Sequence, residues 1–221
     1  MKRQISTSKA HSSRRLVAGV AGLGLVVALA GGTSVSAAGS SPIARLAQAL
    51  TTLTSYRLDL TVSTNKASAS RLRLDVVRTG TSTSAHLTGS EGGQQIDAVI
   101  SGSKVCFKAG GALYQCTSNP QLAASFNQDP SAALVRASKT TTYSSAPSKT
   151  IGGVSCDGYT FKGVQSGFAI NGTLYIQHSS GLPCEDDEIE TRKVASVSTN
   201  DKVVAVWSHL NDKSLTIPTV K

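Results

Sequence analysis

Apolar and polar residues alternate along much of this chain, in short runs that begin near residue 56. Strict alternation places apolar side chains on one face of a β-strand and polar side chains on the other. The apolar members of the four clearest runs are Tyr56, Leu58, Leu60 and Val62; Leu72, Leu74 and Val76; Ala85 and Leu87; and Ile96, Ala98 and Ile100. Turn-forming residues separate the runs, so we predict an antiparallel meander built from hairpins.

A helical spacing precedes the first strand. Ser41 followed by Pro42 is a typical helix start, because the serine caps the first turn and the proline fits its first position. Apolar residues then recur at helical intervals, namely Ile43, Leu46, Leu50 and Leu53. This pattern predicts an amphipathic helix over residues 41–53 that packs one face on the sheet.

Residues 118–146 interrupt the alternation. Asn119-Pro120 is expected to start a short helix that runs through Phe126, and Asp129-Pro130 to cap a second helix. Residues 140–149 are rich in serine and threonine and are interpreted as a connector. Strands are then predicted at residues 154–161, 168–177, 185–197 and 203–209.

A long sheet with one apolar face has to cover that face. The expected fold class is therefore mainly β (α+β), with a curled antiparallel sheet or incomplete β-barrel, an N-terminal helix and a helical lid. The space between sheet and helices is either a packed core or a pocket for an apolar ligand.

The N-terminus has the order of features of an export signal. Basic residues without acids occupy residues 2–15, an apolar run covers residues 16–30, and small residues follow up to Ala38. We therefore predict a signal peptide over residues 1–38 and one domain over residues 39–221. Gly32 stands where a bacterial lipoprotein has its lipidated cysteine, so no lipid anchor is expected there. Arg14-Arg15 leaves twin-arginine export as the alternative to the general secretory route.

Charge narrows the classes of partner. The formal charge of the chain is +9, with 22 basic and 13 acidic residues. Five of the basic residues lie in the predicted signal, so the mature part has 17 basic against 13 acidic residues, a balance of +4. The basic residues of the mature part are scattered and have few aromatic neighbours, which argues against nucleic-acid binding. No transmembrane span is expected after the signal is removed.

Four cysteines lie beyond the predicted signal, at Cys106, Cys116, Cys156 and Cys184. An even number of cysteines in an exported chain predicts two disulfides. Cys106 and Cys116 flank the turn-forming residues 109–112, which favours a bond across a hairpin. Cys156 then pairs with Cys184 by elimination.

Catalytic and metal-binding motifs are weak. His86, His178 and His209 lie in or beside predicted strands among polar neighbours, and neither a Gly-x-Ser-x-Gly nor a His-Glu-x-x-His motif occurs. The acidic run at residues 185–188 is interpreted as a solvated strand segment rather than a calcium site. We expect no cofactor, no metal and no enzymatic activity, with an unrecognised hydrolase as the remaining alternative.

The second half also resembles a known superfamily. The segments that carry the resemblance are the glycine-led run at residues 151–161, the strand starting at Gly172, the turn at residues 180–183 ending in Leu-Pro, and the tail from Leu210 to Pro218. Together with Lys104–Lys108 and the helix at Asp129-Pro130, they are similar to the LolA-type periplasmic lipoprotein carriers and the LppX/LprG-type envelope lipoproteins. Members of that superfamily have an incomplete antiparallel barrel whose mouth is closed by helices.

The resemblance implies a protein that holds the acyl chain of a lipid or lipoprotein in an apolar cavity. Burial of each methylene stabilises such a complex by about 0.8 kcal/mol, without any catalytic group. The candidate ligand contacts on the strands are Tyr56, Leu58, Leu74 and Trp207. We expect an extracytoplasmic monomer. The alternative is a secreted or cell-wall interaction module whose interior is packed and binds no lipid.

Overall fold

The computed structural model of the 221-residue chain describes residues 41–64, 67–91, 93–108, 113–121, 141–165, 168–194 and 197–220. The predicted signal at residues 1–38 lies outside the described residues. So do the two helices predicted between residues 119 and 137, apart from residues 119–121. The predicted helical lid therefore stays a prediction.

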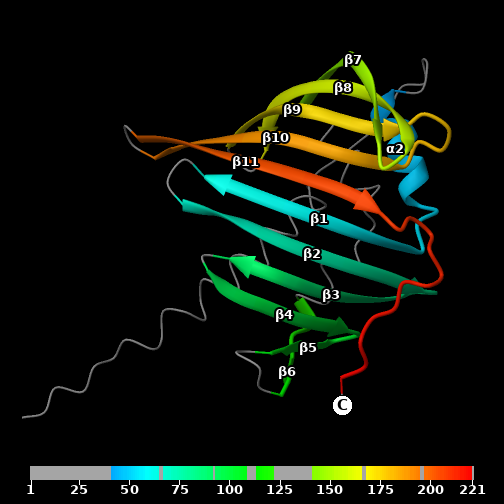
Figure 1. The fold of residues 1–221 in the computed structure, drawn as a ribbon, viewed down its shortest axis with the longest axis vertical. Helices are drawn as coiled ribbons and strands as arrows, with labels where there is room; N and C mark the ends of the chain where they lie inside the picture. Colours follow the sequence, from blue (N-terminus) through cyan, green and yellow to red (C-terminus); the bar gives the residue numbers. More distant parts are fainter. Residues whose placement is uncertain are drawn as a thin grey trace, which may run out of the picture.

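Eleven antiparallel strands form one continuous sheet (Figure 1). The first six are β1 (Ser55–Thr64), β2 (Ala67–Thr79), β3 (Ser82–Glu91), β4 (Gln94–Ser101), β5 (Lys104–Phe107) and β6 (Gln115–Ser118). The other five are β7 (Thr141–Ile151), β8 (Val154–Gln165), β9 (Phe168–Gln177), β10 (Pro183–Val194) and β11 (Val197–Ser208). Their spatial order is β6-β5-β4-β3-β2-β1-β11-β10-β9-β8-β7.

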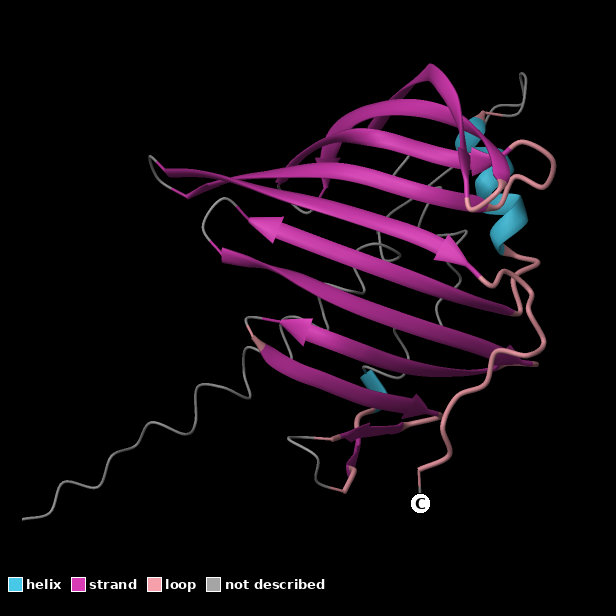
Figure 2. Cartoon of the chain, viewed as in Figure 1, coloured by secondary structure: helices cyan, strands magenta, loops and turns pink. Residues whose placement is uncertain are grey.

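This order joins two meanders along a single seam. The meander β1–β6 runs outward in one direction and β7–β11 returns from the opposite edge, so that β1 and β11 meet in the middle. The seam pairs residues from Arg57↔Ser208 to Thr64↔Asp201. Strands β6 and β7 are the two edges of the sheet, which is therefore open and not closed into a barrel. The predicted antiparallel, mainly β architecture is confirmed at this level (Figure 2).

The one described helix of more than a single turn is α2 (Pro42–Leu50). Ser41 caps it, since its Oγ accepts a hydrogen bond from the backbone N–H of Ala44 at 3.1 Å. The predicted helix is confirmed, although it ends at Leu50 rather than near residue 53. Thr51 and Thr52 follow it, and their hydroxyls donate to the carbonyls of Gln48 and Ala49.

We call the face of the sheet on which α2 packs the inner face. It carries Leu58 on β1 together with the aliphatic residues of the other strands, which form one hydrophobic cluster with the helix residues Ile43, Leu46, Ala49 and Leu50. The alternation of β1 to β4 predicted this face correctly. Each fully buried Leu or Ile side chain contributes about 2 kcal/mol to the stability of the fold.

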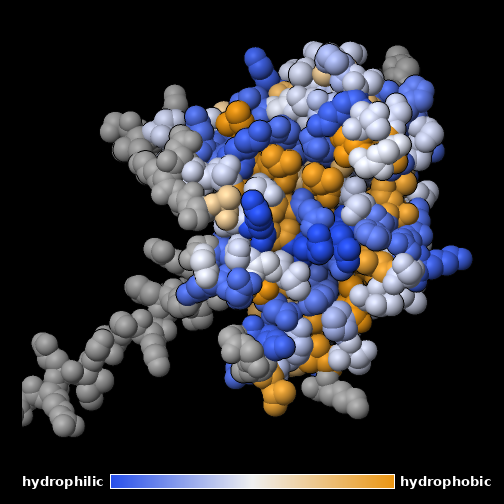
Figure 3. Space-filling view, in the orientation of Figure 1, coloured by the Kyte–Doolittle hydropathy of each residue, from blue (hydrophilic) through white to orange (hydrophobic). Residues whose placement is uncertain are grey.

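The opposite, outer face mixes charged and apolar side chains (Figure 3). Its ion pairs lie across neighbouring strands. Arg57 on β1 makes a two-pronged contact with Asp75 on β2, with N–O distances of 2.7 and 2.8 Å. In the outer-face pair two residues further along the same strands, Arg73 on β2 contacts Asp59 on β1 at 2.7 Å. The outer face is therefore a solvated surface with cross-strand charge pairing.

Two segment predictions were wrong. The serine- and threonine-rich connector expected at residues 140–149 is strand β7, an edge strand whose side chains are mostly exposed, which is why no apolar alternation marks it. The strand expected at residues 185–197 ends at Val194, and Val197 already belongs to β11.

Candidate functional site

The four residues predicted to contact a ligand share the inner face. Leu58 lies opposite Leu74 on one side and opposite Trp207 on the other, so these three side chains form a row across β2, β1 and β11. Tyr56 lies two residues before Leu58 on β1, so its side chain is on the same face. The sheet therefore gathers all four at its centre.

Their exposure separates one of them from the rest. Leu58, Leu74 and Tyr56 are buried core residues, and burial raises the pKa of the Tyr56 hydroxyl. Trp207 is only half-buried and packs at the margin of the core cluster. Of the four, Trp207 is the residue with side-chain surface left for a ligand. A binding role for the other three stays a prediction.

The inner face differs between the two meanders. In the first, Leu58, Leu87, Ile100, Val76 and Val105 are at most 2% exposed. In the second, half-buried aromatic and aliphatic residues border the core. These are Tyr143 on β7, Tyr159 on β8, and Val203 and Trp207 on β11. The first meander has two residues of this kind, Val62 on β1 and Phe107 on β5, so half-buried apolar side chains are more numerous on the β7–β11 half.

Strand β10 brings carboxyl groups to that same half of the inner face. Asp186 lies opposite Ala205 of β11 and Leu174 of β9, both core residues, and Glu188 lies opposite Val203 and Gly172. Direct cross-strand partners point to the same face of a sheet. Asp186 and Glu188, which we call the inner carboxyl pair, thus project among apolar neighbours.

The carboxyl group of Asp186 is enclosed, although the residue as a whole keeps some exposed surface. Its Oδ1 has no hydrogen-bond partner among the described residues. Burial, with smaller contributions from the Asp187 and Glu185 carboxylates, raises the pKa of Asp186 to about 7. An enclosed acceptor without a donor is unusual, because it loses its hydration without replacement.

Glu188 continues the pair along the strand. Burial, followed by the charges of Asp186 and Glu190, raises the pKa of Glu188 to about 8. Its protonated carboxyl hydrogen-bonds that of Glu190. On β7, burial and then the charges of Asp186 and Glu188 raise the pKa of Tyr143, which places this hydroxyl within electrostatic reach of the pair.

Sequence reasoning missed this pair. The acidic run was interpreted as a solvated strand, which is right for Glu185 and Asp187 on the outer face and wrong for Asp186 and Glu188. Alternation does predict that every second carboxyl group of the run shares a face. Acidic residues at consecutive positions, however, gave no signal for which of the two sets points inward.

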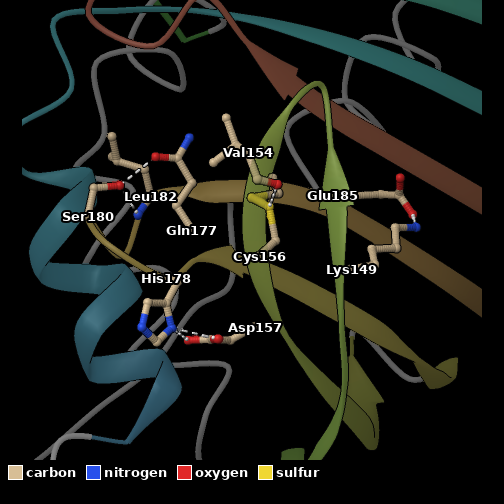
Figure 4. The surroundings of a disulfide bond; sticks show 10 residues. Lys149, Val154, Cys156, Asp157, Gln177, His178, Ser180, Leu182 and Glu185 are labelled. Carbon is tan, nitrogen blue, oxygen red and sulfur yellow. Dashed lines mark hydrogen bonds and ion pairs between the residues drawn. A yellow bond between two sulfur atoms is a disulfide. The ribbon is translucent and has the colours of Figure 1, made fainter.

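Both predicted disulfides are confirmed. Cys106 bonds Cys116 across the β5–β6 hairpin, and Cys156 of β8 bonds Cys184 of β10. Figure 4 shows the second bond near α2 and the contact between Asp157 and His178. Asp157 also pairs with Arg45 of α2 at 3.5 Å, which connects the helix to the start of β8 and the end of β9. Two disulfides are typical of proteins outside the cytoplasm.

Each described histidine hydrogen-bonds an aspartate. His86 contacts Asp97 at 2.9 Å and His178 contacts Asp157 at 2.9 Å. His209 contacts Asp212 at 2.8 Å, and the Ser214 hydroxyl also reaches Asp212 rather than the histidine. A serine nucleophile has to face the imidazole itself, so this last trio is not a catalytic arrangement.

In the part of the chain that the structure describes, no three His, Cys, Asp or Glu side chains converge as metal ligands. A hollow of about 300 Å³ lies on the outer face, between Val99, Lys104 and Cys106 and the C-terminal residues 217–220. None of the described helices has the length and apolar character to cross a membrane.

No family model and no curated protein matches this chain. Among solved structures, it is similar to MucB in the Pseudomonas aeruginosa MucA/MucB complex, at 14% identity and a TM-score of 0.46. That alignment covers 81% of this chain and 60% of the other. A crystal structure of MucB with MucA(peri) gives 14% identity and a TM-score of 0.46, covering 82% and 60%. The chain therefore spans about 60% of the length of the MucB chains it matches.

A LolA superfamily protein from Nitrosomonas europaea is also among the structural neighbours. It has 9% identity and a TM-score of 0.30, and the alignment covers 82% of this chain and 99% of the other.

Proposed function

We propose that this chain is an exported, non-enzymatic binding protein that holds an acyl chain against the β7–β11 half of its inner face. The observation that supports the proposal is the distribution of exposure on that face. Over β1–β5 the inner face is more fully packed, with Val62 and Phe107 as its half-buried apolar residues, whereas Trp207, Val203, Tyr159 and Tyr143 keep surface beside the core on β7–β11. An alkyl chain laid on them removes apolar area from water, worth about 25 cal/mol for each Å².

The sole tryptophan of the chain provides the assay. Trp207 lies on the proposed contact surface, so a terminally brominated dodecanol bound there should quench the intrinsic fluorescence of the full oxidised chain. We expect saturable quenching at concentrations below those at which the alcohol aggregates.

Adjacent residues of β11 offer a matched pair of variants. Val203 lies on the inner face and Val204 on the outer face, and both are half-buried. Val203→Asn should weaken binding of the brominated dodecanol about tenfold through lost apolar contact, whereas Val204→Asn should leave it unchanged. Equal effects of the two variants, or no quenching at any concentration, would contradict acyl-chain binding at this face.

A second candidate function is an interaction module with a filled interior. The closely packed inner face of β1–β5, where five large side chains are at most 2% exposed, favours it, because that part of the sheet leaves little room for a ligand. Native mass spectrometry separates the two. Protein recovered from its native compartment with bound lipid supports carriage, and lipid-free protein that takes up no lipid supports the module.

A further inference from the structure

The two faces of β10 treat their carboxyl groups differently. On the outer face, Glu185 pairs with Lys149 at an N–O distance of 2.6 Å, and Asp187 pairs with Lys202 at 3.1 Å. On the inner face, neither Asp186 nor Glu188 has a basic side chain within ion-pair distance among the described residues. Of the four consecutive acids on this strand, two are paired with lysines, and two have no basic partner in the part of the chain that the structure describes.

The unneutralised groups are also the desolvated ones. The carboxyl of Asp186 is enclosed and its Oδ1 accepts no hydrogen bond from the described residues. Removing a carboxyl group from water without a donor is unfavourable, and buried charges in proteins are normally paired. A hydrogen-bond donor on a ligand would satisfy this oxygen, and a cationic donor would also balance the charge of the ionised carboxyl group.

The surroundings of the pair define the rest of the ligand. Asp186 is flanked by Leu174 and Ala205, and Glu188 by Val203 and the backbone of Gly172. A Cβ on Gly172 would lie 2.9 Å from the Phe161 ring, so that ring covers the glycine beside Glu188. The carboxyl groups are thus set in the same apolar and aromatic surface on which the proposed function places an acyl chain.

We propose that the inner carboxyl pair, Asp186 and Glu188, binds the ammonium or guanidinium head of a cationic amphiphile whose alkyl chain lies along the inner face of β7–β11. This inference rests on the proposed function and names the ligand class for the same surface. An anionic lipid head would meet like charge here. A metal ion lacks a third converging ligand in the described ranges.

Binding of such a head is coupled to protons. The groups that face the pair are Tyr143 from β7, Glu190 from β10 and Asp201 from β11, while Arg45 of α2 is held by Asp157. Burial raises the pKa values of Asp186 and Glu188 to about 7 and about 8, so the pair is largely protonated near neutral pH. A bound cation favours the ionised pair, so affinity should increase as pH rises through this range and protons should be released.

The test compares three amphiphiles with the same alkyl chain: dodecylammonium, dodecanol and dodecanoate. Each is titrated into the full oxidised chain below its aggregation limit, with Trp207 fluorescence and calorimetry as readouts. At about pH 8.5 we expect dodecylammonium to bind about tenfold more tightly than dodecanol, the size of one charge-assisted hydrogen bond. The preference should shrink at about pH 6, where the pair is protonated.

The double variant Asp186→Asn with Glu188→Gln should abolish the preference while retaining dodecanol binding. Its control, Glu185→Gln with Asp187→Asn, removes the same charge from the outer face and should keep the preference. Dodecanol binding also shows that the double variant is folded. Calorimetry in buffers of different ionisation enthalpy should show proton release on dodecylammonium binding in the wild-type chain and in the outer-face control, but not in the inner double variant.

The outcomes separate the two proposals. If none of the three amphiphiles binds, the proposed acyl-chain function fails together with this inference. If dodecanoate binds as tightly as dodecylammonium, or the preference survives in the inner double variant, the cationic head assignment is overturned while carriage stands. Tighter binding of an oligolysine peptide than of dodecylammonium also overturns it, in favour of a basic protein segment.

Discussion

Replacing Asp186 by asparagine should stabilise the protein at alkaline pH. The substitution keeps the size and shape of the side chain and removes its titration. It also supplies an amide in place of a carboxyl group whose Oδ1 is enclosed and unpartnered among the described residues. The wild-type cost therefore arises when Asp186 ionises in the folded state, and the variant avoids that cost.

The sign follows from proton linkage. The pKa of Asp186 is 3.8 in its ordinary state and about 7 in the fold, where burial is the main cause of the increase. Between these pH values the folded protein retains a proton that the unfolded chain has lost, so the free energy of unfolding falls as pH rises. This contribution is fully present below about pH 4 and is lost by about pH 7 and above.

The size follows from the same two pKa values. At about 1.4 kcal/mol for each pH unit between them, the full loss is about 4 kcal/mol. Because the residue keeps some exposed surface and the structure relaxes around the charge, we expect a measured difference of about 2 kcal/mol. Glu188 adds a second titration, whose pKa of about 8 should decrease when the Asp186 charge is removed.

Urea denaturation of the oxidised protein at about pH 4.5, 6, 7.5 and 9 measures the effect. Asp186→Asn should match the wild type at the lowest pH and exceed its free energy of unfolding by about 2 kcal/mol at the highest. The control is Asp187→Asn on the outer face, which loses a surface pair with Lys202 and should change stability by less than about 1 kcal/mol. A difference between Asp186→Asn and wild type that does not grow with pH would refute the reasoning.

Three further predictions each compare two variants, at the disulfides, at two glycines and at two ion pairs. Replacing both Cys156 and Cys184 by serine should lower the free energy of unfolding by about 4 kcal/mol in urea denaturation, and replacing both Cys106 and Cys116 should lower it by about 3 kcal/mol. The first loss is larger because the Cys156–Cys184 bond spans 28 residues rather than 10 and joins two buried cysteines. Gly172→Ala should lower the free energy of unfolding by at least about 2 kcal/mol in thermal unfolding, because its Cβ would lie 2.2 Å from the Asp187 carbonyl oxygen. Gly80→Ala has open space around its Cβ at the turn and should cost about 1 kcal/mol. Equal losses in the two variants would contradict the steric argument. Asp75→Asn should lower the free energy of unfolding by about 2 kcal/mol, because it leaves the two-pronged contact with Arg57 incomplete at a buried site. Asp59→Asn, in the exposed pair with Arg73, should lower it by less than about 0.5 kcal/mol. A similar loss in both variants would argue against a role for burial.

Alternation alone predicted most of the strands, because local side-chain periodicity follows from which face is buried. The predicted runs from Tyr56 to Val62 and from Phe168 to Gln177 lie within β1 and β9. It failed at β7, an edge strand with little apolar content on either face. The pairing of β1 with β11 was also beyond reach, since contacts between residues so far apart in sequence leave no local pattern.

The candidate site was predictable only in part. The row of Leu74, Leu58 and Trp207 follows from the register of neighbouring strands, and the sequence pattern placed all three on apolar faces. The inward direction of Asp186 and Glu188 depends on how β10 is registered against β9 and β11. A strand that has carboxyl groups on both faces does not encode that choice in its own residues.

The seam between β1 and β11 has a consequence for how the molecule is held together. Each meander contains one disulfide, Cys106–Cys116 in the first and Cys156–Cys184 in the second, and neither crosses the seam. Each half can therefore fold early through local contacts, whereas the pairing of β1 with β11, the first and last strands in the sequence, forms last. Separation along that line breaks no covalent bond, so amide hydrogens of Leu58 to Val62 should exchange together with those of Val203 to Trp207, as one cooperative unit.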